Sequence, residues 1–342
     1  MVKGFSLGTS FVSIALKVFL FTFYRESSIE LHTTLHNYHK ESMSDENLHQ
    51  FVLKRVTGFS RLTLILTVLV YNGCFMYLFI PLITIIVEKL QHVPITYLLP
   101  VTALYPWEIS PGGLLYTLTY IYEGYNILCL GIVTCGVDSL FGYYIFHIIG
   151  QLRVLSYDIM TIKSACNVDV LIRKWIKKFV VLKGCCNILQ KIYGPIIVWQ
   201  IVTNSAVICT VLFQISQAKR LSLGRYILII GYSGTKIIQT YIYSWAGSVL
   251  MLESEGLSES VYFSNWLEQC QRFKTSILFI LTQKPLKITA ASCMTVSTEM
   301  FIMVIFPPKH IVKLNVFIYL FQTLNTAVSY FFLLKTFEEQ QS

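Results

Sequence analysis

The sequence predicts an all-α protein, a polytopic bundle of transmembrane helices with six to seven membrane segments. Its composition and the lengths of its apolar runs both predict this fold class. Of the 342 residues, 54% are hydrophobic and only 13% are charged, and the mean hydropathy is +0.60. Soluble domains carry about 25% charged residues. A chain with so few charges has too little polar surface to cover a water-soluble globule.

Seven apolar segments are long enough to cross the hydrocarbon core of a bilayer, which takes about 20 helical residues. They are 5–24, 62–87, 114–149, 192–215, 226–252, 286–306 and 314–335. The third exceeds the length needed, so we expect its helix to project beyond the membrane or to tilt. The first lacks the cleavage site of a signal peptide, so we expect it to stay as a membrane anchor.

The charged loops predict the orientation of these segments. Loop 150–191 carries eight basic residues, and loops 25–60 and 253–287 carry four each, whereas loop 88–113 holds only Lys89. By the positive-inside rule the basic loops are cytoplasmic. Loop 216–225 opposes this assignment, because it is basic although the alternation of loops places it outside.

Several function classes find no support in the sequence. The net charge of +9 is spread between apolar runs rather than gathered on one stripe, which argues against binding to nucleic acid. The nine cysteines lack zinc-ligand spacing and avoid the predicted extracellular loops, so neither a metal, another cofactor nor a disulfide framework is expected. Hydrolase, metalloprotease and P-loop motifs are absent, so the chain is not expected to be an enzyme.

Two other membrane classes stay open as alternatives. Seven spans would give the topology of a G-protein-coupled receptor, but Asp138 and Tyr143 do not form an Asp-Arg-Tyr motif, and the paired extracellular cysteines are missing. A solute transporter would show inverted repeats with paired broken helices near mid-membrane. The sequence shows no such pairing, and segment counting alone establishes neither class.

The C-terminal third resembles the signature of insect odorant receptors. The matching stretches are Glu255-Gly256-Leu257-Ser258, Trp266, Gln283 through Ala290, Thr295 through Phe301 and Thr326 through Phe331. Upstream, Gly58-Phe59-Ser60-Arg61 and Phe146 through Leu152 follow in the family's usual order. No single stretch is specific to the family, but their order along the chain is.

The resemblance implies a ligand-gated cation channel subunit that detects small volatile odorants together with an obligate coreceptor subunit. The resemblance also implies a place in the plasma membrane of olfactory sensory dendrites, in contact with lipid, and assembly with the coreceptor as a hetero-tetramer. Residues 1–342 would then form a single domain. Within it, the stretch 264–283 matches a cytoplasmic anchor helix and 286–335 matches the pore-helix region.

Two departures from the family pattern stand out. The chain lacks a counterpart of the family's first helix, and residues 305–323, which contain Pro307-Pro308, interrupt the pore helix as an insertion. A helix with two prolines loses backbone hydrogen bonds, which is costly in lipid. We interpret the insertion as a retained intron, and a genuine insertion that inactivates or remodels the receptor is the alternative.

A pocket for volatile molecules needs aromatic walls and few polar groups. The family places it between helices in the outer half of the membrane, and the candidates there are Phe75, Tyr77, Tyr120, Glu123, Tyr125 and Tyr232. For each aromatic residue, simple packing or a position in the interfacial belt is the alternative. For Glu123 the alternative is a structural hydrogen bond to a tyrosine.

Seven further residues within or near the apolar segments have an expected role or position. Glu299 matches an acidic position of the family's pore helix, and Leu333 matches its hydrophobic gate. We expect Lys17 and Lys236 to reach towards the membrane surface through their flexible chains. His32, His36 and His39 share a helical face, which we expect to be solvated rather than metal-binding.

Overall fold

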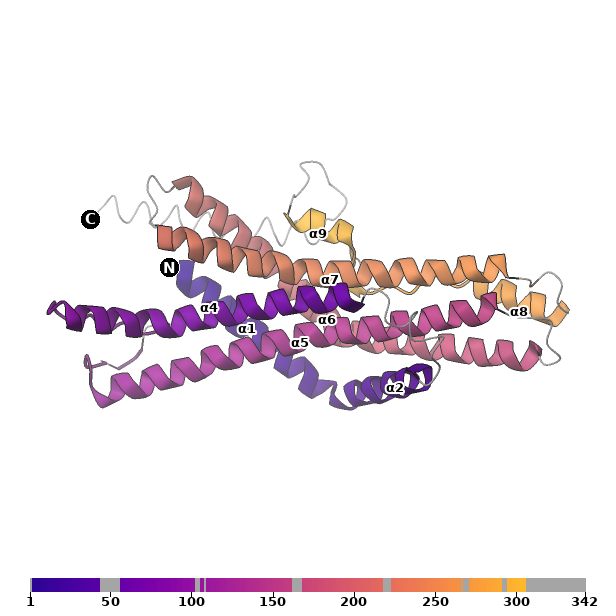
Figure 1. Cartoon of the computed structure of the whole chain (residues 1–342), viewed down its shortest axis with the longest axis horizontal. Helices are drawn as coiled ribbons and strands as arrows, with labels where there is room; N and C mark the ends of the chain where they lie inside the picture. The colour runs from indigo at the N-terminus through magenta and orange to yellow at the C-terminus, as the bar shows by residue number, and fades with distance from the viewer. Residues whose placement is uncertain are drawn as a thin grey trace.

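The computed structural model describes residues 2–43, 56–101, 105–107, 109–161, 168–217, 223–264, 266, 271–290 and 294–305. These residues form a bundle of long helices with one short hairpin (Figure 1). The helices are α1 (Val2–Phe23), α2 (Arg25–Met43), α4 (Val56–Leu90), α5 (Leu114–Met160), α6 (Val168–Gln217), α7 (Leu223–Phe263), α8 (Gln271–Leu281) and α9 (Thr298–Ile305). The strands are β1 (Thr289–Ala290) and β2 (Met294–Thr295).

The helical fold predicted from the sequence is confirmed. Each of the first five apolar segments lies in its own helix, and α4, α5 and α7 run side by side along the long axis of the molecule (Figure 1). Within the described residues, α4 and α5 are long and apolar enough to cross a membrane. The stretch Gly8–Phe23 of α1 is apolar too, but shorter.

The surface of α5 divides this helix into two parts. Its N-terminal part exposes large apolar side chains, among them Ile121, Leu128 and Ile132, as expected where a helix faces lipid. In its C-terminal part nearly every residue from Tyr144 to Leu155 is buried against neighbouring helices. The prediction that this helix is longer than a membrane span therefore matches the structure, because its second part is enclosed by protein.

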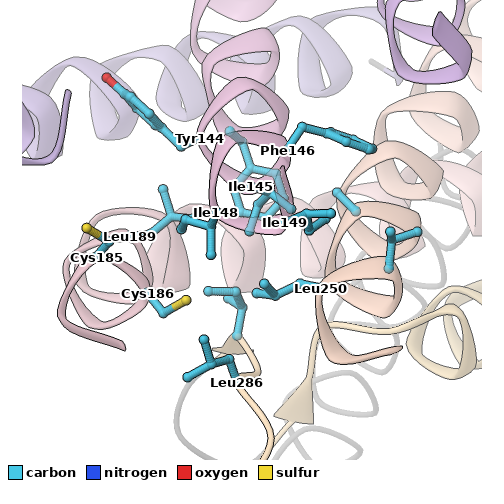
Figure 2. Packing of buried hydrophobic residues seen from close by; sticks show 14 of the residues in the cluster. Tyr144, Ile145, Phe146, Ile148, Ile149, Cys185, Cys186, Leu189, Leu250 and Leu286 are labelled. Carbon is cyan, nitrogen blue, oxygen red and sulfur yellow. The ribbon is translucent and has the colours of Figure 1, made fainter. Parts of the chain in front are cut away.

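The enclosed part of α5 forms the main apolar core (Figure 2). Ile145, Ile148 and Ile149 are fully buried and belong to one cluster with Leu189 of α6 and Leu250 of α7. Outside the membrane, burying one such side chain is worth about 1.5–3 kcal/mol. The polar helix α2 covers another side of this core through Leu31 and Leu35, which it turns inward at a spacing of one helical turn.

A glycine sets the distance between α4 and α5. A Cβ atom at Gly142 would overlap the aromatic ring of Phe59, so only glycine lets the two helices approach this closely. Phe59 in turn packs on Phe146, with ring centroids 4.9 Å apart. Gly136 lies on the same helix, but an added Cβ there would meet nothing within 4 Å.

One predicted helix differs from the structure. The apolar segment 286–306 is not a continuous helix, because β1 and β2 form an antiparallel hairpin and α9 begins only at Thr298. The backbone N–H of Val296 donates to the carbonyl of Ile288 at 2.9 Å, and Ser297 caps α9. β-Branched residues favour strands here, and apolarity alone does not separate a strand from a helix.

The rest of the C-terminal prediction is tested only in part. Within the predicted anchor helix 264–283, the described helix is α8, which begins at Gln271 and ends at Leu281. Its apolar face buries Phe273 and Ile277 against α6 and α7. The segment 314–335, most of the predicted insertion 305–323 and the predicted gate residue Leu333 lie outside the described residues.

Candidate functional site

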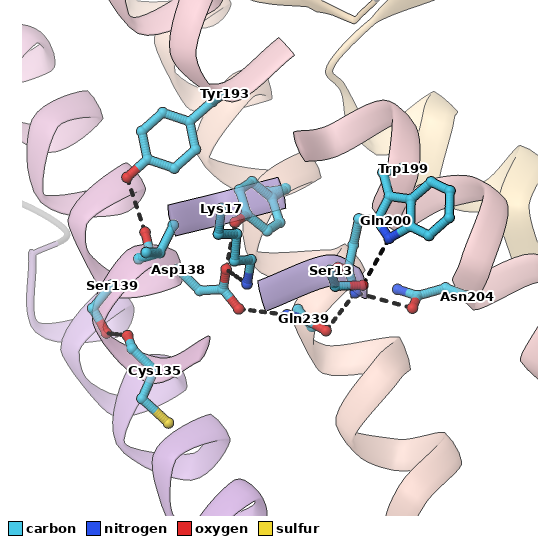
Figure 3. A network of polar contacts seen from close by, with 12 residues as sticks. Ser13, Lys17, Cys135, Asp138, Ser139, Tyr193, Trp199, Gln200, Asn204 and Gln239 are labelled. Carbon is cyan, nitrogen blue, oxygen red and sulfur yellow. Dashed lines mark hydrogen bonds and ion pairs between the residues drawn. The ribbon is translucent and has the colours of Figure 1, made fainter. Parts of the chain in front are cut away.

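A buried ion pair joins α1 to α5 in the middle of the bundle. The Lys17 ammonium donates to Asp138 Oδ1 at 2.6 Å, and the two side chains are 2% and 0% exposed. Two residues of α7 complete the surroundings of this carboxylate (Figure 3). Tyr243 donates to Oδ1 at 2.5 Å, and the amide of Gln239 donates to Oδ2. The carboxylate of Asp138 therefore accepts from three side chains on two helices.

The polar contacts continue from α7 into α6. Gln200 Nε2 donates to Gln239 Oε1 at 2.5 Å and to Asn204 Oδ1 at 3.0 Å. Asn204 Nδ2 in turn donates to Thr240 Oγ1 at 2.7 Å and to the backbone carbonyl of Lys236 at 3.2 Å. The amide hydrogens of Gln200 and Gln239 point towards the negative charge of Asp138. The donors of Asn204 point the other way, towards Thr240 and the backbone of Lys236.

A second set of contacts holds α1 against α6. Trp199 Nε1 donates to Ser13 Oγ at 2.8 Å, and Ser13 Oγ donates to the carbonyl of Thr9. Because Ser13 and Lys17 lie one helical turn apart, the same face of α1 contacts both Trp199 and Asp138. We call the residues of these paragraphs, Ser13, Lys17, Asp138, Trp199, Gln200, Asn204, Gln239, Thr240 and Tyr243, the polar network.

The prediction that Lys17 reaches to the membrane surface was wrong. Its side chain is buried, because Asp138 offers a full negative charge inside the bundle, where a paired cation is far more stable than an isolated one. The pair is separated by 121 positions in the sequence. The signal that sequence reasoning missed is the spacing of polar residues on α7, where Lys236, Gln239 and Tyr243 share one face.

Among the predicted ligand residues, Glu123 already has partners within the protein. Its carboxylate accepts from the backbone N–H of Val101 at 2.8 Å and from the Tyr105 hydroxyl at 2.5 Å, so it ties the loop between α4 and α5 to the bundle. Burial and this hydrogen bond raise the pKa of Tyr105. Tyr120 donates its hydroxyl to the carbonyl of Leu78 and thereby joins α5 to α4.

The other predicted ligand residues fall into two groups. Phe75 and Tyr125 are 52% and 66% exposed on the outside of the chain. Tyr77 instead lies half-buried on α4, and on α7 Tyr232 Oη lies 3.4 Å from Ser10 Oγ of α1. Tyr77 and Tyr232 thus belong to two helices, α4 and α7, that pack against each other.

The base of α9 rests on α7. The backbone N–H of Thr298 donates to Ser248 Oγ at 2.7 Å, and the rings of Tyr241 and Phe301 are 5.3 Å apart. A Cβ atom at Gly247 would overlap the carbonyl of Val296, so the chain entering α9 touches the backbone of α7 directly. The predicted pore residue Glu299 lies in the first turn of α9, where its side chain is exposed.

The three histidines of α2 meet a fourth from α5. His32 and His36 are exposed, as expected for a solvated face, whereas the ring of His39 lies 4.5 Å from that of His147. Within the described residues, no group of three or more histidine, cysteine or acidic side chains is arranged to hold a metal ion.

Comparison with known proteins agrees with this arrangement. Residues 1–305 match the family model described as 7tm Odorant receptor, and the match ends where the predicted insertion begins. Odorant receptor 13a of Drosophila melanogaster is 23% identical over 316 residues, which cover 86% of this chain and 69% of that protein. Odorant receptor 85f of the same species is 26% identical over 247 residues, covering 68% and 61% of the two chains.

Solved structures show the same fold. The insect olfactory receptor OR5 from Machilis hrabei in complex with eugenol superposes with a TM-score of 0.75 at 17% identity, covering 95% of this chain and 81% of that one. A second structure of that receptor gives a TM-score of 0.72 at 18% identity and covers 87% of this chain and 76% of the other. This is a helical membrane-protein fold, and the match of the family model covers nearly nine-tenths of the sequence. The chain therefore belongs to the seven-transmembrane odorant receptor family.

Proposed function

We propose that this chain is the odorant-binding subunit of a ligand-gated cation channel, formed with a coreceptor subunit in the plasma membrane of sensory dendrites. The observation that carries the proposal is the double role of α7. Its outer part presents Tyr232, and a few turns further on its Tyr241, Gly247 and Ser248 hold the base of α9. One rigid helix thus reaches from the candidate odorant site to the helix that we assign to the pore.

The odorant site lies between α1, α4 and α7 in this proposal. Tyr77 and Tyr232 form its aromatic wall, and the neighbouring serine of α1 adds a hydroxyl group. Phe75, Tyr120 and Tyr125 surround the entrance from α4 and α5. The solved neighbour was captured with eugenol, a small aromatic odorant, which supports a site of this chemistry.

The pore is assigned to α9 and the residues that follow it, with Glu299 as its acidic group and Leu333 as its gate. The stretch 264–283 is assigned to the interface with the coreceptor. An odorant opens the channel only if it binds the open arrangement more tightly than the closed one. A shift of α7 on binding meets this requirement, because α7 contacts both the site and α9.

The test is coreceptor-dependent current. Cells that express this chain with an insect coreceptor are expected to carry an inward cation current when a panel of volatile odorants is applied. Cells with the coreceptor alone serve as the control and should not respond to the same odorants. A response that needs no coreceptor and disappears when G-protein signalling is blocked would contradict the proposal. Uptake coupled to protons or sodium would contradict it as well.

A further inference from the structure

A second lysine in the bundle, Lys236 of α7, forms no ion pair with an acidic side chain in the part of the chain that the structure describes. Its ammonium lies 5.7 Å from the centre of the Tyr232 ring, one helical turn towards the N-terminal end of α7. The side chain is half-buried, and among the described residues Asp138 acts on it only at longer range, without a hydrogen bond. A cation–π contact of this kind is weak compared with an ion pair.

The sequence itself limits which acids can neutralise this charge. Only three acidic residues occur in the seven apolar segments, namely Glu123, Asp138 and Glu299. None occurs in residues 208–230, which include the end of α6 and the start of α7. An acidic partner for Lys236 inside the apolar segments must therefore be one of those three residues or a molecule from outside the chain.

Two of these acids have other partners in the structure, and the third lies far along α7. Asp138 already accepts from Lys17, Gln239 and Tyr243, so its negative charge is matched by the ammonium of Lys17. Glu123 accepts from the loop between α4 and α5. Glu299 lies at the base of α9 beside Ser248, which is 12 residues or about 18 Å along α7 from Lys236.

The polar neighbours of Lys236 do not replace an acid. Asn204 and Thr240 both donate to the backbone carbonyl of Lys236. Thr240 Oγ1 also accepts from Asn204, so these groups are already used among themselves. A cation in a medium of low dielectric constant is costly without a counter-charge or strong acceptors. Among the described residues the ammonium therefore has unused donors, and these point to a ligand.

We propose that Lys236 selects odorants that carry a carboxylate or carbonyl oxygen, holding that oxygen beside Tyr232 and Ser10. This inference rests on the proposed function, because it names the ligand class of the same odorant site. Tyr232 then has two tasks, since its ring faces the ammonium and its hydroxyl lies 3.4 Å from Ser10 Oγ. The aliphatic part of the odorant packs on the aromatic wall that Tyr77 shares.

The test uses three probes of equal carbon number, octanoate, octanal and octane, which share an alkyl chain but differ in the oxygen. Binding is measured on the purified complex with the coreceptor, and currents are recorded separately in cells. Lys236→Met keeps the length of the side chain and removes its charge. Lys236→Arg keeps the charge. Lys89→Met, at an exposed position beyond the end of the membrane segment, removes one positive charge from the surface as the matched control.

The expected result is selective. Lys236→Met should weaken binding of octanoate and octanal by about tenfold or more, since a hydrogen bond to a charged group is lost. Binding of octane should stay within about threefold. Lys236→Arg should keep most of the affinity for octanoate, and Lys89→Met should change nothing.

Three outcomes would overturn the inference. The first is that octanoate and octanal bind the unchanged protein no more tightly than octane does, or do not bind at all. The second is that their affinity survives Lys236→Met. The third outcome is an equal loss for all three probes, which would mark Lys236 as a structural residue. If the probes bind as expected but no odorant evokes a current, the channel function fails and the assignment of Lys236 stands.

Discussion

Replacing Asp138 with asparagine tests whether the polar network holds the bundle together. The substitution keeps the shape of the side chain but removes the only negative charge within reach of Lys17, and both groups are buried. Breaking a buried ion pair from one side costs about 3–5 kcal/mol, because the remaining charge is left without compensation. We therefore expect Asp138→Asn to lower the free energy of unfolding by about that amount.

The hydrogen bonds around Asp138 add to this cost. Asparagine at this position replaces one of the two carboxylate oxygens with an N–H₂ group, which donates and cannot accept. That group then faces another donor, either the amide of Gln239 or the groups of Tyr243 and Lys17. If Gln239 rotates to accept, it can no longer accept from Gln200, so the mismatch moves along the chain of amides. Each buried donor without an acceptor costs about 1–3 kcal/mol.

The measurement is equilibrium unfolding of the purified receptor in mixed micelles, repeated for Lys17→Met and for the double variant. Because the two residues are in contact, the double variant should be clearly more stable than the sum of the single losses predicts. Glu253→Gln is the matched control. It removes one partner of the Arg153–Glu253 pair, whose side chains are 8% and 22% exposed. Because this pair keeps more contact with solvent than Lys17 and Asp138, its loss should cost less than Asp138→Asn. The reasoning fails if Asp138→Asn costs no more than this control or if the single losses simply add.

Three further variants probe the helix contacts. Gly142→Ala should destabilise the protein by about 1–3 kcal/mol, because the added Cβ overlaps an aromatic ring of α4. Gly136→Ala on the same helix is the control and should be neutral or slightly stabilising. Thermal unfolding in detergent compares the two variants. Gly247→Ala should lower the free energy of unfolding by about 1–3 kcal/mol and reduce the maximal odorant current, because the new methyl group meets the carbonyl of Val296. An unchanged current would show that this contact does not transmit gating. Glu123→Gln should lower the free energy of unfolding by about 1–3 kcal/mol and make the loop between α4 and α5 sensitive to protease. If odorant sensitivity is lost while the loop stays protected, Glu123 is a ligand residue instead.

The helices of this receptor are largely predictable from its sequence because apolarity in a membrane protein is a strong local signal. The runs that form α1, α4 and α5 are continuous over about 20 residues or more. The stretch before α9 is different. Its β-branched residues are apolar enough for a membrane helix, and only the pairing of Thr289 with Thr295 and contacts to α6 and α7 make it a hairpin.

The candidate site was less predictable, because its chemistry depends on which helices meet. Lys17 and Asp138 are each visible in the sequence as charges within apolar runs, but nothing local says that they pair across 121 positions. The same limit applies to Glu123, whose partners Val101 and Tyr105 lie in a loop without a periodic pattern. Acidic and basic residues within apolar segments can be counted from sequence alone, but only the structure shows that Asp138 pairs with Lys17 and not with Lys236.

The arrangement of charges on α7 connects stability with ligand recognition. Gln239 and Tyr243 bind the carboxylate that neutralises Lys17, so this part of α7 is held firmly against α1 and α5. Lys236 lies one turn away on the same helix and lacks such a partner. In the proposed mechanism, an oxygenated odorant supplies the missing acceptor and shifts α7 next to this fixed part, and the shift reaches Gly247 and α9 through the same helix. Because the network lies between the two ends, weakening it should alter the response to odorants even where folding is preserved.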